Sequence, residues 1–137
     1  MNTTGHPSER LINLARTIQS KARAPFSLFR VGAVLVTSSG ALYTGCNIEN
    51  SSYSLTICAE RVAIFKAISE GETTFTDLYL CGDAPAWTHP CGACRQVLMD
   101  LAGPDLAIHL IHRDNSVRTV TCSDLLPDHF SASDLPS

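Results

Sequence analysis

Residues 57–101 read ICAERVAIFKAISEGETTFTDLYLCGDAPAWTHPCGACRQVLMDL. Apolar residues recur at helical spacing from about residue 58 to residue 69, and Gly71 ends the pattern. Residues 77–81 form a short apolar strand, and a second helix is expected from about residue 92 to residue 101, ahead of Gly103-Pro104. A strand therefore lies between two helices, and each helix begins beside cysteines.

Further strands are predicted on both sides of this segment. They are expected at residues 31–37, 41–46, 107–111 and 117–121, where short apolar and β-branched runs are bounded by turn residues. The turn at residues 113–116 leaves a link between the last two strands that is too short for a parallel crossover. These two strands should therefore pair antiparallel.

An amphipathic helix opens this arrangement. It begins at Pro7-Ser8 and is expected to end near Ala24, because the residue before Pro25 avoids helical backbone. The alternation of helices and strands predicts an α/β fold, organised as a single three-layer αβα domain over residues 1–137. We expect a five-stranded mixed sheet with helices on both faces, and a loose tail after about residue 130.

The composition is that of a folded domain, with 45% hydrophobic and 17% charged residues. The formal net charge of -3 argues against a nucleic-acid partner. No secretory leader is visible, and no apolar run reaches the roughly 20 residues of a membrane helix. We therefore expect a cytoplasmic protein with no membrane partner. Disulfides are rare in the cytoplasm, so the six cysteines are expected to be metal ligands or small buried side chains.

Cys91-Gly92-Ala93-Cys94 is a Cys-x-x-Cys pair at the start of a helix. By itself it fits a redox pair, half of a structural zinc site or a chance occurrence. A structural zinc site would need a fourth protein ligand, taken from Cys46, Cys81, Cys122 or His89. A catalytic site also accounts for Cys58. In that site Cys58, Cys91 and Cys94 bind one Zn²⁺ per chain, and water takes the open fourth position.

Glu60 is the candidate for proton transfer beside this metal site. Residues two apart on a helix point in different directions. Cys58 and Glu60 can therefore converge only if Cys58 lies at the helix start, where the backbone is not yet helical. Three thiolates would also leave the zinc unit negatively charged, which weakens its effect on water. Arg61 and Arg95 are expected to offset that charge by donating to thiolate sulfur.

Several motifs together resemble the small homotetrameric zinc-dependent cytidine deaminases of the cytidine/deoxycytidylate deaminase superfamily. They include the signature of zinc deaminases, in which a Glu that is not a zinc ligand accompanies a Pro-Cys-x-x-Cys run. The resemblance extends from residue 8 to about residue 130. It rests on Phe29-Arg30-Val31-Gly32-Ala33, Gly45-Cys46-Asn47-Ile48-Glu49-Asn50, Ile57-Cys58-Ala59-Glu60-Arg61, Pro90-Cys91-Gly92-Ala93-Cys94-Arg95-Gln96 and Leu125-Leu126-Pro127.

This resemblance implies hydrolytic deamination of free cytidine and deoxycytidine to uridine and deoxyuridine, with release of ammonia, as part of pyrimidine salvage. A zinc-bound hydroxide would attack C4 of the pyrimidine while Glu60 shuttles protons. The implied substrate contacts are Phe29 with the pyrimidine ring, Asn47 and Glu49 with the ribose hydroxyls, Ala59 in the substrate site, and Phe130 from a neighbouring subunit of a homotetramer.

Three positions depart from the family pattern. Phe26 stands where Tyr is frequent, Leu28 where a polar residue is usual, and His89 where Ser commonly precedes the proline. These positions bear on fine specificity more than on the reaction.

Three alternatives remain in view. They are deamination of another aminopyrimidine, such as a blasticidin-type antibiotic, deamination of a polynucleotide, and a non-catalytic zinc-stabilised binding module. The Asn47-x-Glu49 pair argues against the first, the acidic charge and the antiparallel final strands against the second, and Glu60 against the third.

Overall fold

The structure, a computed structural model, describes residues 7–136. Its elements are α1 (Glu9–Gln19), β1 (Val31–Thr37), β2 (Leu42–Cys46), the 3₁₀ turn η1 (Tyr53–Leu55), α2 (Ala59–Ser69), β3 (Phe75–Gly82), α3 (Gly92–Ala102), β4 (Ala107–Ile111), β5 (Val117–Thr121), α4 (Cys122–Leu125) and the 3₁₀ turn η2 (Ala132–Asp134). Within these residues no helix is both long enough and apolar enough to cross a membrane.

The five strands form one sheet in the order β2-β1-β3-β4-β5. β1 is antiparallel to both of its neighbours, β3 and β4 are parallel, and β4 and β5 are antiparallel. Helix α3 lies in the crossover that the parallel pair requires. The predicted mixed sheet and its antiparallel final pair are therefore confirmed.

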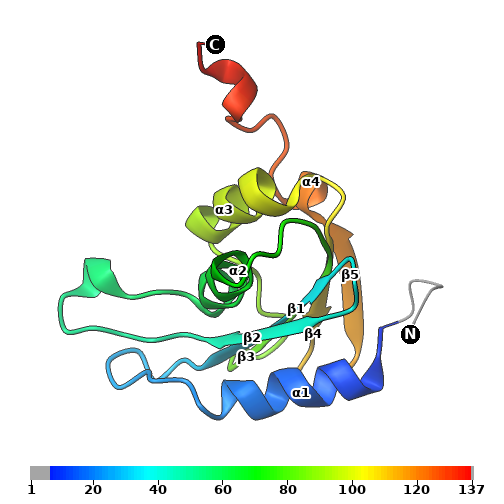
Figure 1. Cartoon of the computed structure of the whole chain (residues 1–137). Helices are drawn as coiled ribbons and strands as arrows, with labels where there is room; N and C mark the ends of the chain where they lie inside the picture. Colours follow the sequence, from blue (N-terminus) through cyan, green and yellow to red (C-terminus); the bar gives the residue numbers. More distant parts are fainter. Residues whose placement is uncertain (1–6, 137) are drawn as a thin grey trace.

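Helices cover both faces of the sheet (Figure 1): α1 packs on one face, and α2 and α3 pack on the other. Successive side chains of a strand point to opposite faces, so each strand serves both layers. The core against α1 includes Val34, Tyr79, Cys81 and Ile111, and the core against α2 and α3 includes Ala33, Leu35, Leu78 and Leu80. This arrangement confirms the predicted three-layer α/β fold.

Helix α1 is shorter than the sequence predicts, because it ends at Gln19 and not near Ala24. The main chain of Arg23 is taken up by a different part of the protein. Its N–H donates to the carbonyl of Asn47 over 3.0 Å, and its carbonyl accepts from the N–H of Glu49 over 2.9 Å. These long-range bonds replace further helical turns and bring the segment before β1 alongside the segment after β2.

The chain beyond β5 forms a short helical turn, α4, and then runs away from the sheet (Figure 1). The carbonyl of Phe130 accepts a hydrogen bond from the side chain of Gln96 on α3 over 3.0 Å. Phe130 as a whole is 59% exposed. The tail therefore offers an aromatic side chain that its own domain does not bury.

Helix α2 lies very close to the neighbouring strand β2, and Gly45 makes this possible. A Cβ atom at position 45 would lie 2.3 Å from the carbonyl oxygen of Ala59 and 2.6 Å from the nitrogen of Ala63. Both contacts are with helix backbone, which cannot turn aside as a flexible side chain can. The absence of a side chain at Gly45 therefore sets the position of the first turn of α2.

We predict that Gly45→Ala destabilises the protein by about 1–3 kcal/mol, the usual cost of overpacking a filled interior. The matched control is Gly92→Ala, because a Cβ at position 92 meets nothing within 4 Å. This control should change the free energy of unfolding by no more than about 0.5 kcal/mol. Urea unfolding of both variants is the measurement. Equal stability of Gly45→Ala and the parent would contradict the close approach of α2 and β2.

Candidate active site

The N-termini of two helices bring three cysteines together. Cys58 is the N-cap of α2 and Cys91 is the N-cap of α3, and both have extended backbone (φ −72°, ψ 155° and φ −68°, ψ 168°). Cys94 lies in the first turn of α3 and is fully buried. The three Sγ atoms lie within 4.8 Å of one another, and those of Cys58 and Cys91 are 3.8 Å apart. The structure therefore places the three predicted ligands in one cluster.

This cluster fits a tetrahedral zinc ion. Zinc–sulfur bonds of about 2.3 Å at tetrahedral angles put neighbouring sulfurs roughly 3.8 Å apart, close to the Cys58–Cys91 separation. Within residues 7–136, none of the four possible additional ligands joins the cluster: Cys46, Cys81, Cys122 and His89. Burial raises the pKa of the Cys81 and Cys122 thiols to about 11, which keeps both protonated. The geometry therefore favours three protein ligands over a structural four-ligand site.

The thiol of Cys58 is acidified by its neighbours in the cluster. Its pKa is lowered to about 5, first by a hydrogen bond with Cys94 and then by Arg61. The Nη2 of Arg61 donates to the Sγ of Cys58 over 3.3 Å. A thiolate is the form that binds metals, so these neighbours prepare Cys58 for a metal ion. The arrangement also matches the expected donation from Arg61 to sulfur.

Glu60 follows Cys58 by two positions and is 4% exposed. Its pKa is raised to about 7, mainly because burial penalises the charged carboxylate, and the nearby Cys58 adds to the effect. A carboxyl group that titrates near neutral pH can both accept and release a proton. Because Cys58 is an N-cap with extended backbone, the condition set for the convergence of Cys58 and Glu60 is met.

A cavity of about 280 Å³ opens beside the cluster. This volume lies just below the range for small-molecule sites in proteins, which measure roughly 300–1,000 Å³. One wall consists of Cys58, Ala59, Glu60 and Cys91 at the two helix starts. The rest of the lining comes from the first residue of β1 and from the segments before β1, after β2 and before α3: Val31, Ser27, Phe29, Asn47, Thr56, Thr88 and His89.

Asn47 lies in this cavity, but its amide is already bonded to the backbone. Its Oδ1 accepts from the N–H of Val31 over 2.9 Å, and its Nδ2 donates to the carbonyl of Phe29 over 2.8 Å. Asn47 therefore holds the segment that carries Phe29. An amide offers two donors and two acceptor positions, so one of each stays open for a ligand.

Glu49 lines an adjoining cavity of about 310 Å³, together with Phe26, Ser27, Tyr53 and Thr56. Its Oε1 accepts from the N–H groups of Phe26 and Ser27 over 2.9 and 3.1 Å, and its Oε2 accepts from the hydroxyl of Ser27. The hydrogen bond from Ser27 is the main cause of the lowered pKa of Glu49. The carboxylate can accept about four hydrogen bonds, so one position remains for a ligand.

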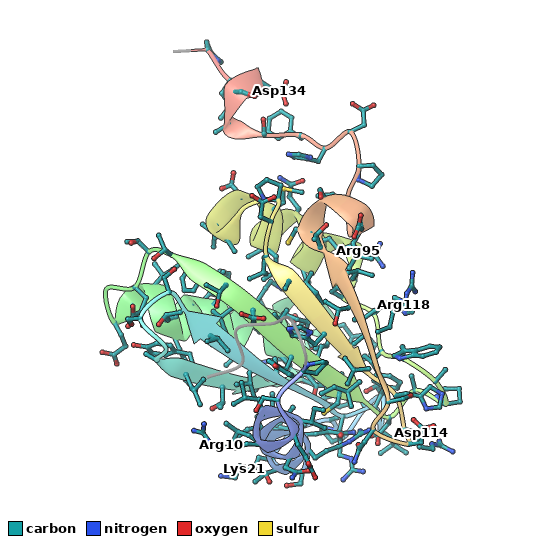
Figure 2. All side chains as sticks on the ribbon, turned by 90° about the vertical axis from the view of Figure 1, so that its right-hand side faces the viewer. Arg10, Lys21, Arg95, Asp114, Arg118 and Asp134 are labelled. Carbon is teal, nitrogen blue, oxygen red and sulfur yellow. The ribbon has the colours of Figure 1, made fainter. Side chains whose placement is uncertain are left out.

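Two expected site residues lie elsewhere. The side chain of Arg95 projects toward α4 (Figure 2), where its Nη1 donates to the carbonyl of Leu125 over 2.9 Å, while its Nε donates to the carbonyl of Pro90 over 2.8 Å. Arg95 thus braces the backbone, and the expected donation to thiolate sulfur is not among its hydrogen bonds. One residue along a helix rotates the side chain by about 100°, which turns Arg95 away from Cys94. Phe130 lies on the tail, outside the cavity of its own chain.

The sequence reasoning missed several residues that line the cavities. Ser27 borders both cavities and orients Glu49, and Thr56 also borders both. Thr88 and Val31 line the cavity beside the cysteines. Small hydroxyl and apolar residues next to a recognised motif carry no pattern of their own, so only their nearness to Phe29, Cys58 and Cys91 in the sequence could have indicated them.

Comparison with known proteins agrees with this geometry. The family described as "Cytidine and deoxycytidylate deaminase zinc-binding region" matches residues 6–110. A cytidine deaminase of Sporosarcina psychrophila is 42% identical over 127 residues, which cover 93% of each chain. The crystal structure of a cytidine deaminase from Burkholderia pseudomallei superposes with a TM-score of 0.87 at 42% identity, covering 91% of this chain and 100% of that one. A cytidine deaminase of Mycobacterium tuberculosis gives a TM-score of 0.77 at 37% identity, with 88% and 94% covered.

Proposed function

Because this chain belongs to the cytidine and deoxycytidylate deaminase family, we propose that it hydrolyses the 4-amino group of free cytidine and deoxycytidine, in nucleoside salvage. The observation that carries the proposal is the shared cavity of Cys58, Cys91 and Glu60, with Cys94 directly behind it. This set supplies metal ligands and a buried proton carrier around a cavity of about 280 Å³. The full-length similarity to proteins named cytidine deaminase supports the choice of substrate.

Cys58, Cys91 and Cys94 would hold one zinc ion per chain. When bound, zinc acts as a Lewis acid that lowers the pKa of a water molecule at its open position. Arg61 partly offsets the charge of the thiolates through its hydrogen bond to Cys58. Arg95 supports the same region indirectly, because it fixes the carbonyl of Pro90 immediately before Cys91.

Glu60 would carry protons in this reaction. It takes one proton from the attacking water and delivers it to N3 of the pyrimidine. It then carries the second proton of that water, released as the C4 carbonyl forms, to the departing amino group, which leaves as ammonia. A pKa of about 7 suits both directions of transfer, because the group then binds and releases a proton with little free-energy difference at neutral pH. Burial also keeps bulk water from competing for the proton.

Phe29 and Ala59 would contact the pyrimidine, and Asn47 and Glu49 would bind the sugar hydroxyls with the hydrogen-bonding positions that the backbone leaves open. Asn47 and Glu49 would then each have two roles. They hold the segment that carries Phe29. Asn47 also presents one donor and one acceptor position to the substrate, and Glu49 presents one acceptor position.

We also propose a homotetramer in which Phe130 of one subunit completes the site of a neighbour. Phe130, Leu135 and Leu101 line an open groove beside Phe65 of α2, and all four side chains are at least 36% exposed. An exposed apolar surface of this kind marks a contact with another protein surface. The groove lies at the tail and not at the metal cluster, so Phe130 is free to serve another chain.

The proposed function is tested by ammonia release from cytidine, deoxycytidine, cytosine, CMP and adenosine. We expect activity on the first two only.

In the same assay Glu60→Gln should lose at least about 10³-fold in rate and keep its zinc, since general acid–base catalysis contributes roughly 10²–10⁴-fold per step and Glu60 serves several steps. Cys91→Ala should lose zinc and activity together. A Glu60→Gln variant that kept a tenth of the parental rate would assign the proton transfer to another residue.

The proposed sugar contacts are tested by comparing cytidine with 2′,3′-dideoxycytidine. Asn47→Ala and Glu49→Gln should reduce kcat/KM for cytidine by about 5–150-fold, since one hydrogen bond to a buried polar group is worth on the order of 1–3 kcal/mol. With the dideoxy substrate, which lacks the hydroxyls, the same variants should show a much smaller reduction in kcat/KM. An equal loss on both substrates would limit these residues to holding the loop.

The proposed tetramer is tested by analytical ultracentrifugation together with the Phe130→Ala variant. The parent should sediment as a tetramer at assay concentration, and Phe130→Ala should lower cytidine turnover without changing zinc content, because Phe130 is remote from the cysteines of its own chain. His129→Ala, at the neighbouring tail position, is the matched control. A fully active parental monomer would contradict the proposal.

A further inference from the structure

Two loops that border the cavity meet at the edge of the sheet. β1 and β3 are antiparallel and pair Val31 with Gly82, so Arg30 and Asp83 are the next residues outward. Arg30 stands between Phe29 and Val31, which both line the cavity. Asp83 opens the loop that carries Thr88 and His89 and then reaches Cys91.

Both main-chain polar groups of Arg30, its carbonyl and its N–H, form hydrogen bonds with Asp83. Its carbonyl accepts from the N–H of Asp83 over 3.1 Å, as in a continuing strand ladder. Its N–H donates to the Oδ2 of Asp83 over 2.8 Å. The carboxylate therefore stands in for a strand carbonyl at the point where the chain after β3 leaves the sheet.

A buried side chain from the opposite layer fixes the carboxylate. Gln19 of α1 is 7% exposed, and its Nε2 donates to the Oδ1 of Asp83 over 3.1 Å and to the carbonyl of Arg30 over 3.3 Å. The Oε1 of Gln19 accepts from Arg16 and from the thiol of Cys81, which orients the amide. Every polar atom of Gln19 is thus used to hold this junction in one arrangement.

The ion pair between the two side chains is the lesser part of the contact. The Nε and Nη2 of Arg30 lie 3.1 and 3.3 Å from the Asp83 oxygens, but the two side chains are 51% and 28% exposed. An exposed pair contributes only about 0–1 kcal/mol to stability. The significance of Asp83 therefore lies in the backbone that it fixes.

We propose that Asp83 is a positioning residue for the substrate ring. It ties the loop of Phe29 to the loop that leads to Cys91, and so sets the gap between the aromatic wall and the metal wall of the cavity. The proposal rests on the proposed deaminase function, because the ring that this gap accepts is the pyrimidine of the substrate.

The test compares Asp83→Ala with Arg30→Ala in the zinc-loaded protein. Asp83→Ala removes the acceptor for the Arg30 N–H, whereas Arg30→Ala removes the ion pair and keeps both main-chain bonds. Asp83→Ala should lower kcat/KM for cytidine by roughly 10–100-fold, the cost of a misplaced contact. The loss should appear mainly in KM, with zinc content unchanged, since ring binding and not chemistry is affected. Arg30→Ala should stay within about fivefold of the parent.

Asp83→Asn serves as the second variant if Asp83→Ala does not fold. It keeps the size and one acceptor but places an amide N–H₂ against the donors of Arg30 or Gln19, so an intermediate rise in KM is expected. Parental kinetics for the folded Asp83 variants, loss of zinc from them, or an equal loss in Arg30→Ala would each overturn the inference. A parent that releases no ammonia from cytidine would instead overturn the proposed function itself, and this inference with it.

Discussion

The antiparallel pairing of β1 with both of its neighbours determines where the site can form. When a strand runs opposite to the strands on either side, its start lies beside their ends. Gly32 near the start of β1 pairs with Cys46 on one side and with Cys81 on the other. The segments 26–30, 47–56 and 83–90 therefore meet at one edge of the sheet. The lining of the cavity apart from the helix starts and Val31 comes from these three segments.

The helix starts complete the cavity because their first turns are not free to shift. Gly45 allows the backbone of α2 to approach β2, which places Cys58 at the same sheet edge. As an N-cap, Cys58 has extended backbone, so its thiol and the Glu60 carboxyl reach the same space in spite of their spacing of two. A cysteine inside a regular helix could not have shared a site with Glu60 in this way. The position of the cap residue is thus a chemical requirement as much as a structural one.

Local patterns were sufficient to predict the layered fold, the final antiparallel pair and the cysteine cluster. Each of these rests on short motifs that can be recognised locally, such as the short link after β4, the two cysteines at the start of α3 and the Cys58-x-Glu60 run. The errors concern contacts between distant segments. Helix α1 ends early because Arg23 bonds to residues 47 and 49, and Arg95 faces a carbonyl of Leu125 that is 30 positions away. Asp83 was not singled out, because its role depends on Arg30 and Gln19, which are 53 and 64 positions distant.

The cavity also shows why binding and stability are difficult to separate in this protein. Asn47 uses half of the hydrogen-bonding capacity of its amide, and Glu49 most of that of its carboxylate, on residues 26–31, so few positions are left for a ligand. That division is favourable, because a polar group whose partners are already fixed loses little conformational freedom when a ligand takes the last position.

Glu60, in contrast, is buried with little electrostatic compensation. Its burial raises its pKa and disfavours the charged form, and no salt bridge joins it among the described residues. A buried carboxyl without an ion partner costs folding free energy. Such a cost is typical of a group retained for its chemistry, and the backbone bonds of Asn47 and Glu49 help to offset it at the same sheet edge.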